Sequence, residues 1–94
     1  MRLTPAQVDI IKRTAQSVLG SGIRITLFGS RVSDAGKGGD VDLYIEAPHI
    51  DLMKKIQCKV SLQDQLDMPV DLVIKPPGDN SPISRIAKQE GVRL

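Results

Sequence analysis

The chain has 94 residues, a formal net charge of +2 and 40% hydrophobic residues. Its length predicts one domain with little left for a second lobe, and its scattered basic residues do not indicate a nucleic-acid-binding surface. Its only aromatic residues, Phe28 and Tyr44, cannot build a stacking platform for single-stranded nucleic acid, and its single cysteine, Cys58, excludes an internal disulfide. No long apolar run or signal peptide is present, so we expect a soluble, cytoplasmic α/β domain without membrane contact.

The first element predicted along the chain is a helix that begins at Thr4-Pro5. Thr4 can cap the helix, Pro5 suits its first turn, and Gln7 completes a capping box with Thr4. Apolar residues then recur at helical spacing until Gly20-Ser21-Gly22 ends the helix.

Two strands, a helix, a third strand and a last helix are predicted after this helix. Segments 23–28 and 41–46 alternate apolar and polar residues, which is typical of strands that place one face on a core. Residues 51–66 have helical spacing, 70–75 form the most apolar strand, and Ser81-Pro82 starts a last helix that reaches about residue 90. The apolar residues that carry the spacing of the middle helix are Leu52, Ile56, Val60 and Leu66. The predicted order is α-β-β-α-β-α.

Three aspartates stand where carboxylates are disfavoured. Asp40 and Asp42 are separated by one residue at the start of a strand, so their side chains point the same way, roughly 6 to 7 Å apart along the chain. Asp71 lies within the apolar strand 70–75, where a lone charge is costly. If that strand lies beside the strand 41–46, the three carboxylates could converge and hold Mg²⁺. Taken singly, Asp40 could simply end the preceding loop, and Asp71 could pair with a basic residue.

A glycine-serine element precedes these carboxylates. Gly29 would let the backbone approach a ligand closely, Ser30 offers a hydroxyl and an N–H to phosphate oxygens, and Arg31 could add positive charge. The spacing and the Lys-Ser/Thr ending of a Walker A loop are missing. Alone, Gly29-Ser30 is compatible with an ordinary turn, and only its combination with the aspartates indicates a phosphate site.

A strand, then Gly-Ser, then nine residues, then Asp-x-Asp, and then a lone Asp in a later strand resembles the polymerase-β-like nucleotidyltransferase superfamily. The segment FGSRVSDAGKGGDVDLYIE looks most like the minimal nucleotidyltransferases, the MntA-like proteins. One departure is Val32, where the family usually has a small residue after the arginine. The resemblance implies a small mixed sheet with helices packed on one face.

The resemblance also implies a role for each motif residue. Gly29 and Ser30, with Arg31 beside them, would hold the triphosphate of a nucleotide, expected to be ATP. Asp40 and Asp42 would each bind Mg²⁺, with two ions expected. Asp71 would complete the metal site and help to deprotonate the attacking hydroxyl. The reaction would transfer a nucleoside monophosphate, expected to be AMP, and release pyrophosphate.

Larger members of the superfamily carry a further domain that holds the acceptor, for which 94 residues leave no room. Acceptor recognition is therefore expected from a partner chain or a second copy. Minimal nucleotidyltransferases commonly act as antitoxins that attach AMP to a tyrosine of a HEPN-domain toxin, in a type VII-like toxin–antitoxin pair. Two alternatives stay open: a non-catalytic antitoxin that occludes its toxin, and a small-molecule nucleotidyltransferase similar to antibiotic-modifying enzymes.

Overall fold

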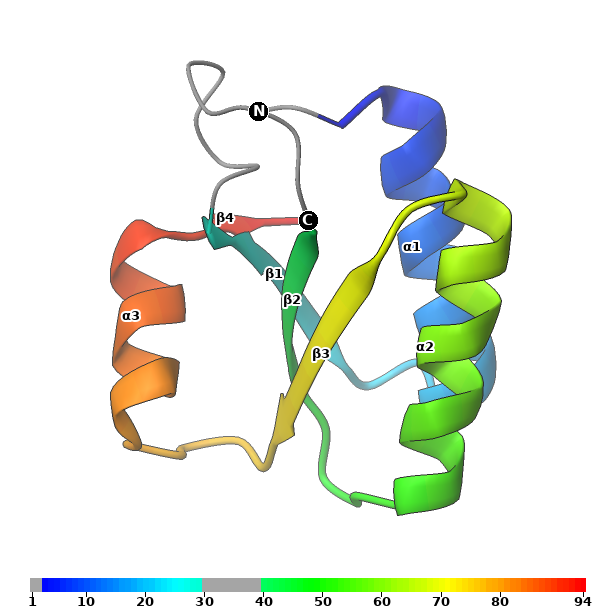
Figure 1. Cartoon of the computed structure of the whole chain (residues 1–94). Helices are drawn as coiled ribbons and strands as arrows, with labels where there is room; N and C mark the ends of the chain where they lie inside the picture. The colour runs from blue at the N-terminus through cyan, green and yellow to red at the C-terminus, as the bar shows by residue number, and fades with distance from the viewer. Residues whose placement is uncertain (1–2, 30–39) are drawn as a thin grey trace.

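A computed structural model describes residues 3–29 and 40–94 of the chain (Figure 1). These residues form three helices and four strands. They are α1 (Pro5–Leu19), β1 (Arg24–Phe28), β2 (Val41–Glu46), α2 (Leu52–Leu66), β3 (Val70–Lys75), α3 (Pro82–Glu90) and β4 (Val92–Arg93). The predicted order is confirmed, and the two-residue strand β4 is an addition that the sequence did not indicate.

The four strands form one mixed sheet in the order β3-β2-β1-β4. β1 is antiparallel to both β2 and β4, whereas β2 and β3 are parallel. A parallel pair needs a long connection, and α2 provides this crossover between β2 and β3. The strand that carries Asp71 therefore lies beside the strand that carries Asp42.

The helices cover both faces of the sheet. α1 and α2 pack side by side on one face, as expected, and α3 lies on the opposite face (Figure 1). The expectation that all helices share one face therefore holds for two of the three. Gly91 allows the end of α3 to approach β1 closely, because a Cβ there would collide with a backbone oxygen of Ala87 and the side chain of Thr26.

The main core lies between the sheet and the pair α1 and α2. The alternation in β1 and β2 sends every second residue to this side, and these residues are buried. They are Ile25 and Leu27 of β1 and Val41, Leu43 and Ile45 of β2, which join Ile11, Ala15, Cys58 and Leu62 from the helices in one cluster. Within residues 3–29 and 40–94, no helix combines the length and the apolarity that a membrane span requires.

Side chains cap the N-terminal ends of α1 and α2. Thr4 and Gln7 form the predicted capping box, and the side chain of Asp51 accepts hydrogen bonds from the backbone N–H groups of Met53 and Lys54. Of the four apolar residues that carried the predicted spacing of α2, Leu66 is buried, whereas Leu52, Ile56 and Val60 are exposed. The buried residues of α2 are Cys58, Leu62 and Leu66.

Candidate functional site

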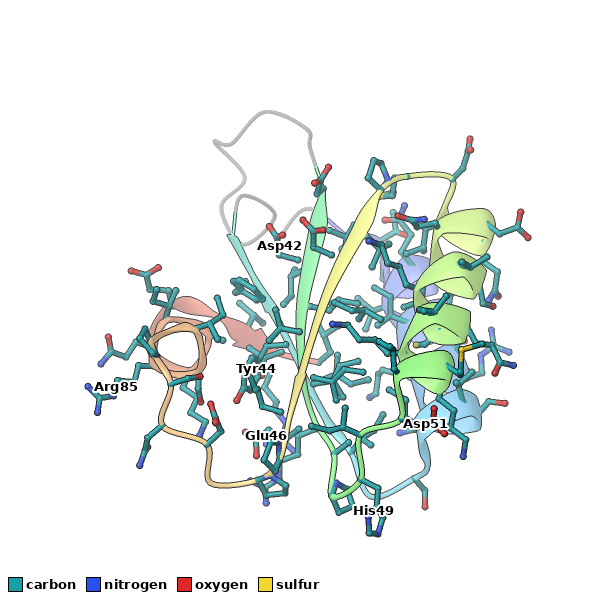
Figure 2. All side chains as sticks on the ribbon, turned by 60° about the horizontal axis from the view of Figure 1, so that its bottom comes forward. Asp42, Tyr44, Glu46, His49, Asp51 and Arg85 are labelled. Atoms are coloured by element: carbon teal, nitrogen blue, oxygen red, sulfur yellow. The ribbon has the colours of Figure 1, made fainter. Side chains whose placement is uncertain are left out.

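Asp42 and Asp71 are neighbours across the parallel pair of strands. They are register partners in the ladder of β2 and β3, so their backbones are about 4.8 Å apart in the hydrogen-bonding direction. Asp42 lies on the same side of β2 as Tyr44 and Glu46, facing the layer of α3 rather than the main core (Figure 2). The convergence of these two carboxylates was the condition on which the predicted metal site depended.

The environment of Asp42 disfavours its charged form. Its side chain is half-buried, whereas Asp40 and Asp71 are exposed. Burial is the main cause that raises the pKa of Asp42, followed by the negative charges of Asp71 and Asp40 and a hydrogen bond with the side chain of Asp71. The repulsion between these carboxylates would be reduced by a divalent cation, for which their oxygens are suitable ligands.

Gly29 lies against Asp42 at the end of β1. Phe28 is the register partner of Asp42, and Gly29 follows it with a φ of +78°. A Cβ at this position would collide with the carboxylate of Asp42. The positive φ therefore favours glycine here, and a Cβ would also displace the carboxylate of Asp42, which gives the first residue of the predicted Gly-Ser element a structural reason.

The other predicted site residues are placed only in part. Ser30 and Arg31 lie outside the described residues. Asp40 is described, and it precedes β2 directly. In the part of the chain that the structure describes, no three histidine, cysteine, aspartate or glutamate side chains form a ready group for a metal ion. The negative charges of Asp71 and Asp40 nevertheless raise the pKa of Asp42, so the three carboxylates are close enough to interact, although they are not arranged as ligands of one ion.

Tyr44 is a neighbour of the site that the sequence analysis did not single out. It is 1% exposed, and its hydroxyl has no hydrogen-bond partner among the described residues. Two residues further along the same face, the carboxylate of Glu46 lies 3.9 Å from the Nζ of Lys88 on α3. The alternation in β2 placed Tyr44 on the face of Asp42, but nothing in it indicated that α3 would cover this face.

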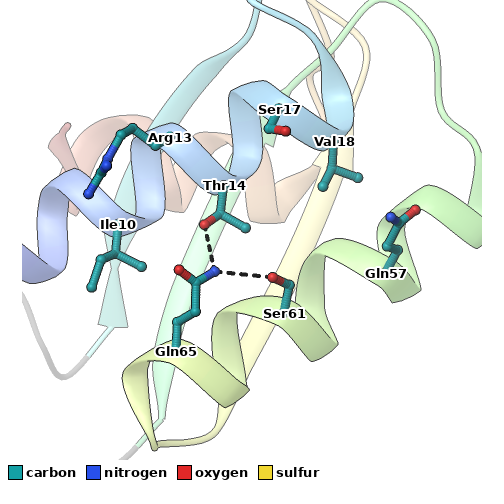
Figure 3. Close-up of a pocket in the computed structure, with 8 residues that line it drawn as sticks. All are labelled: Ile10, Arg13, Thr14, Ser17, Val18, Gln57, Ser61 and Gln65. Carbon is teal, nitrogen blue, oxygen red and sulfur yellow. Dashed lines mark hydrogen bonds between the residues drawn. The ribbon is translucent and has the colours of Figure 1, made fainter.

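A cavity of about 400 Å³ lies between α1 and α2, on the far side of the sheet from Asp42 (Figure 3). Its lining includes Gln65, whose side chain donates hydrogen bonds of 2.9 Å to Thr14 and 3.1 Å to Ser61. The one ionisable group in the lining, Arg13, is paired with Asp9 at 2.8 Å. This cavity holds no acid–base or nucleophilic pair, so the carboxylates of β2 and β3 remain the candidate site.

A comparison with protein families identifies the domain. Residues 8–94 match the model of the family described as nucleotidyltransferase domain. The chain belongs to this family. Among proteins with curated descriptions, none matches the chain.

Solved structures of similar fold support the assignment of the nucleotidyltransferase fold. A chain of the toxin–antitoxin MntA-HepT has a TM-score of 0.76 and 19% identity, with 96% of this chain and 70% of that chain covered. A chain from Shewanella oneidensis has a TM-score of 0.75 and 17% identity, with 98% and 71% covered. A chain of a mutant toxin–antitoxin pair has a TM-score of 0.74 and 22% identity, again with 98% and 71% covered. At these identities the likeness establishes the fold alone.

Proposed function

We propose that this nucleotidyltransferase uses Mg²⁺ to transfer AMP from ATP to a hydroxyl group of a partner protein in the cytoplasm. The observation that carries the proposal is the register pairing of Asp42 with Asp71, next to Gly29, where a Cβ would collide with the carboxylate of Asp42. Family membership supports the reaction class, and the carboxylates support the metal.

Asp40, Asp42 and Asp71 would hold the metal ions. Burial is the first cause of the raised pKa of Asp42, and the repulsion from Asp71 and Asp40 that adds to it is what a bound cation would remove. Bound there, Mg²⁺ would supply positive charge to the phosphate oxygens and to the leaving pyrophosphate.

The residues of the chain have separate tasks in the transfer. Gly29 lets the Asp42 carboxylate lie against the backbone at the end of β1, and Ser30 and Arg31 would bind the phosphate oxygens of the nucleotide. Asp71 would accept or direct the proton that the attacking hydroxyl loses. The acceptor oxygen forms a bond to the α-phosphorus, and the bond from that phosphorus to pyrophosphate breaks. Atoms and charge balance without a further reactant.

The acceptor proposed is a tyrosine of a HEPN-domain toxin, for which this chain would be the antitoxin. The support is the fold shared with a chain from the toxin–antitoxin pair MntA-HepT. Attachment of AMP would silence the toxin, and the enzyme would then act as a protein adenylyltransferase.

The test incubates the chain with ATP labelled at the α-phosphate, Mg²⁺ and the product of the adjacent gene. Label is expected on the partner, and Asp42→Asn is expected to abolish it. Glu90→Gln, which removes an exposed carboxylate at the end of α3, is the matched control and should leave labelling unchanged.

Other results of this assay would overturn the proposal. A tight complex without label on the partner would assign the chain to antitoxins that act by occlusion. In a parallel reaction with an aminoglycoside in place of the partner, label on the aminoglycoside would assign the chain to small-molecule nucleotidyltransferases. Label that survives in Asp42→Asn would remove the carboxylates from the mechanism.

A further inference from the structure

β3 lies at one edge of the sheet, with β2 on its inner side (Figure 1). No strand in the described part of the chain pairs with its outer side. An edge strand presents unpaired N–H and C=O groups, which can pair with a strand of another chain. The outer side of β3 is therefore a candidate interface, and it carries Asp71 of the proposed metal site.

The hydrogen bonds of β3 show which of its backbone groups point outward. The carbonyl oxygens of Pro69 and Lys75 accept hydrogen bonds of 2.9 and 3.0 Å from backbone N–H groups at the two ends of β2. Successive residues of a strand direct their backbone groups to opposite sides. The N–H and C=O groups of Val70, Leu72 and Ile74 therefore point away from β2.

Two features limit the free edge to the middle of the strand. The N–H of Val70 donates a 3.0 Å hydrogen bond to Oε1 of Gln63 on α2. Pro76, which follows the strand, has no N–H to donate. Among the described residues, no group hydrogen-bonds to the outward N–H and C=O groups of Leu72 and Ile74. The free edge thus has two donors and two acceptors.

This edge is complementary to itself. When two copies of β3 pair antiparallel about Val73, Leu72 of each copy faces Ile74 of the other, and each such pair exchanges two N–H···O=C hydrogen bonds. All four outward groups of each copy are then satisfied. Asp71 of each copy lies opposite Lys75 of the other, in a pair whose Cα atoms are about 4.5 Å apart. Opposite charges in this position stabilise the pairing of strands.

Other registers lose this match. A pairing centred on Asp71 or on Lys75 places like charges opposite each other, which is destabilising. A pairing centred on Leu72 or on Ile74 places each charge opposite an uncharged residue. The charges of the strand therefore select the register about Val73.

Two carboxylates of the same copy also lie near Lys75. Glu46 is its register partner in β2, and the Glu46 carboxylate lies 3.9 Å from the Nζ of Lys88 on α3. Hydrogen bonds from Ser81 lower the pKa of Asp79, and the charge of Lys75 lowers it further. Both carboxylates have a partner besides Lys75, so this lysine remains available to a second copy.

On the opposite face of the sheet, α2 brings both like charges and apolar surface to the seam. Lys55 and Lys59 lie eight and four residues before Gln63 and therefore on its side of the helix, near the outer edge of β3. Their repulsion between copies opposes the dimer, but their flexible stems let the ammonium groups separate into solvent. Ile56, on the same side, is 48% exposed, and its burial would favour the dimer.

We propose that two copies of this chain pair through β3 about Val73, and that Lys75 of each copy completes the carboxylate site of the other. Asp71 is the register partner of Asp42, so the incoming ammonium group lies at the edge of that site. There it offsets negative charge and adds a donor for the phosphate oxygens of the nucleotide. The part of Lys75 in transfer rests on the proposed function, whereas the dimer does not.

The test exchanges the two charges singly and then combines the variants. Sedimentation equilibrium should show a wild-type dimer. Asp71→Lys and Lys75→Glu should each weaken it by about tenfold or more, because each places like charges opposite each other at both ends of the seam. An equimolar mixture of the two variants should form a heterodimer, in which both pairs again have opposite charges. Lys12→Glu changes an exposed lysine of α1 and, as the matched control, should sediment like wild type.

Label transfer tests the contribution of Lys75 to the site. Lys75→Glu alone should transfer about tenfold less label or lower still, and Asp71→Lys should transfer none. Their mixture should recover transfer, because the Lys75→Glu subunit keeps its three aspartates and receives a lysine from the Asp71→Lys subunit. Circular dichroism confirms that each variant is folded, and Lys12→Glu should transfer normally.

Several results would contradict the interface: a monomeric wild type, single variants that sediment as dimers, or a mixture without heterodimer. A monomeric wild type that binds the product of the adjacent gene through Lys75 would assign the edge of β3 to that protein. A heterodimer that recovers no transfer would reject the part of Lys75 in the site. Failure of the proposed function has a different signature, because wild-type transfer would then be absent or independent of Asp42 while the sedimentation results stand.

Discussion

Asp42 and Asp71 occupy the same register position on two parallel neighbouring strands, one half-buried and the other exposed. This pairing places two negative charges across a single strand spacing of about 4.8 Å. Such an arrangement is unfavourable for folding without a cation and favourable for catalysis with one. The carboxylates of the candidate site therefore lower the stability of the protein and support its activity, and substitution of Asp42 should change these two properties in opposite directions.

Asp42→Asn should raise stability while it removes activity. The pKa of Asp42 is raised above 3.8 in the folded protein, first by burial. The stability linked to this group is therefore fully present below pH 3.8 and lost as the pH rises through the raised pKa. At neutral pH the charged form opposes folding, so the variant should melt at a higher temperature than wild type, while transfer falls by about 10²-fold or more.

Thermal melts from pH 3 to pH 8, without divalent cations, check the stability half of this prediction. The difference in melting temperature between Asp42→Asn and wild type should grow with pH and level off near neutrality. A difference that is constant over this range, or that shrinks with pH, would contradict the assignment of the raised pKa to Asp42.

Mg²⁺ should stabilise the wild-type protein through the same carboxylates. A ligand that binds only the folded state at about 100 times its Kd adds about 2.7 kcal/mol to the free energy of unfolding. Addition of MgCl₂ should raise the melting temperature of wild type, EDTA should reverse the effect, and Asp42→Asn should lose most of it. An equal rise in both proteins would mean that the ion binds elsewhere.

Gly29→Ala should cost more than Gly78→Ala. Both glycines have a positive φ, +78° and +84°, so alanine strains the backbone similarly at either site. Only at Gly29 would the new Cβ collide with Asp42, and nothing lies within 4 Å of it at Gly78. Gly78→Ala should lower the free energy of unfolding by about 1 kcal/mol and spare activity. Gly29→Ala should add about 1 to 3 kcal/mol to this loss and abolish transfer.

Urea titrations of the two glycine variants supply the free energies of unfolding, and the labelling assay supplies the activities. Similar losses in the two variants would show that the contact with Asp42 carries no energetic weight.

Cys58 should resist thiol reagents in the folded protein. Its side chain is buried, and burial raises the pKa of the thiol to about 11. The thiolate, which is the reactive form, is therefore scarce at pH 8. Reaction with iodoacetamide should be slow in buffer and fast in urea above the unfolding midpoint, and mass spectrometry measures both rates. Fast labelling of the native protein would mean that α2 opens readily from the core.

Most of the fold follows from local patterns in the sequence. The bounds of β2 and β3 match the predicted segments 41–46 and 70–75, because apolar residues alternate there and prolines or turns flank them. The capping signals at Thr4 and Ser81 placed the starts of α1 and α3. β4 could not be predicted, because two residues are too few to show any period.

What the sequence could not provide was the arrangement of elements around one another. The spacing of α2 contains two apolar rows, and only the packing decides that the row of Cys58, Leu62 and Leu66 is buried and the row of Leu52, Ile56 and Val60 is exposed. The convergence of Asp42 with Asp71 likewise depends on strand order, since 29 residues separate them in the chain. The cover that α3 places over Tyr44 depends on tertiary packing in the same way.

The crossover through α2 has a consequence for how this domain can vary. A shift of one residue in the pairing of β2 and β3 would turn Asp71 to the opposite face of the sheet, away from Asp42. The stretch between the two strands must therefore return the chain to β3 in this register, with Cys58, Leu62 and Leu66 still facing the core. Insertions and deletions within α2 should therefore be selected against far more strongly than substitutions on its exposed side, because each added residue turns the following buried residues away from the core.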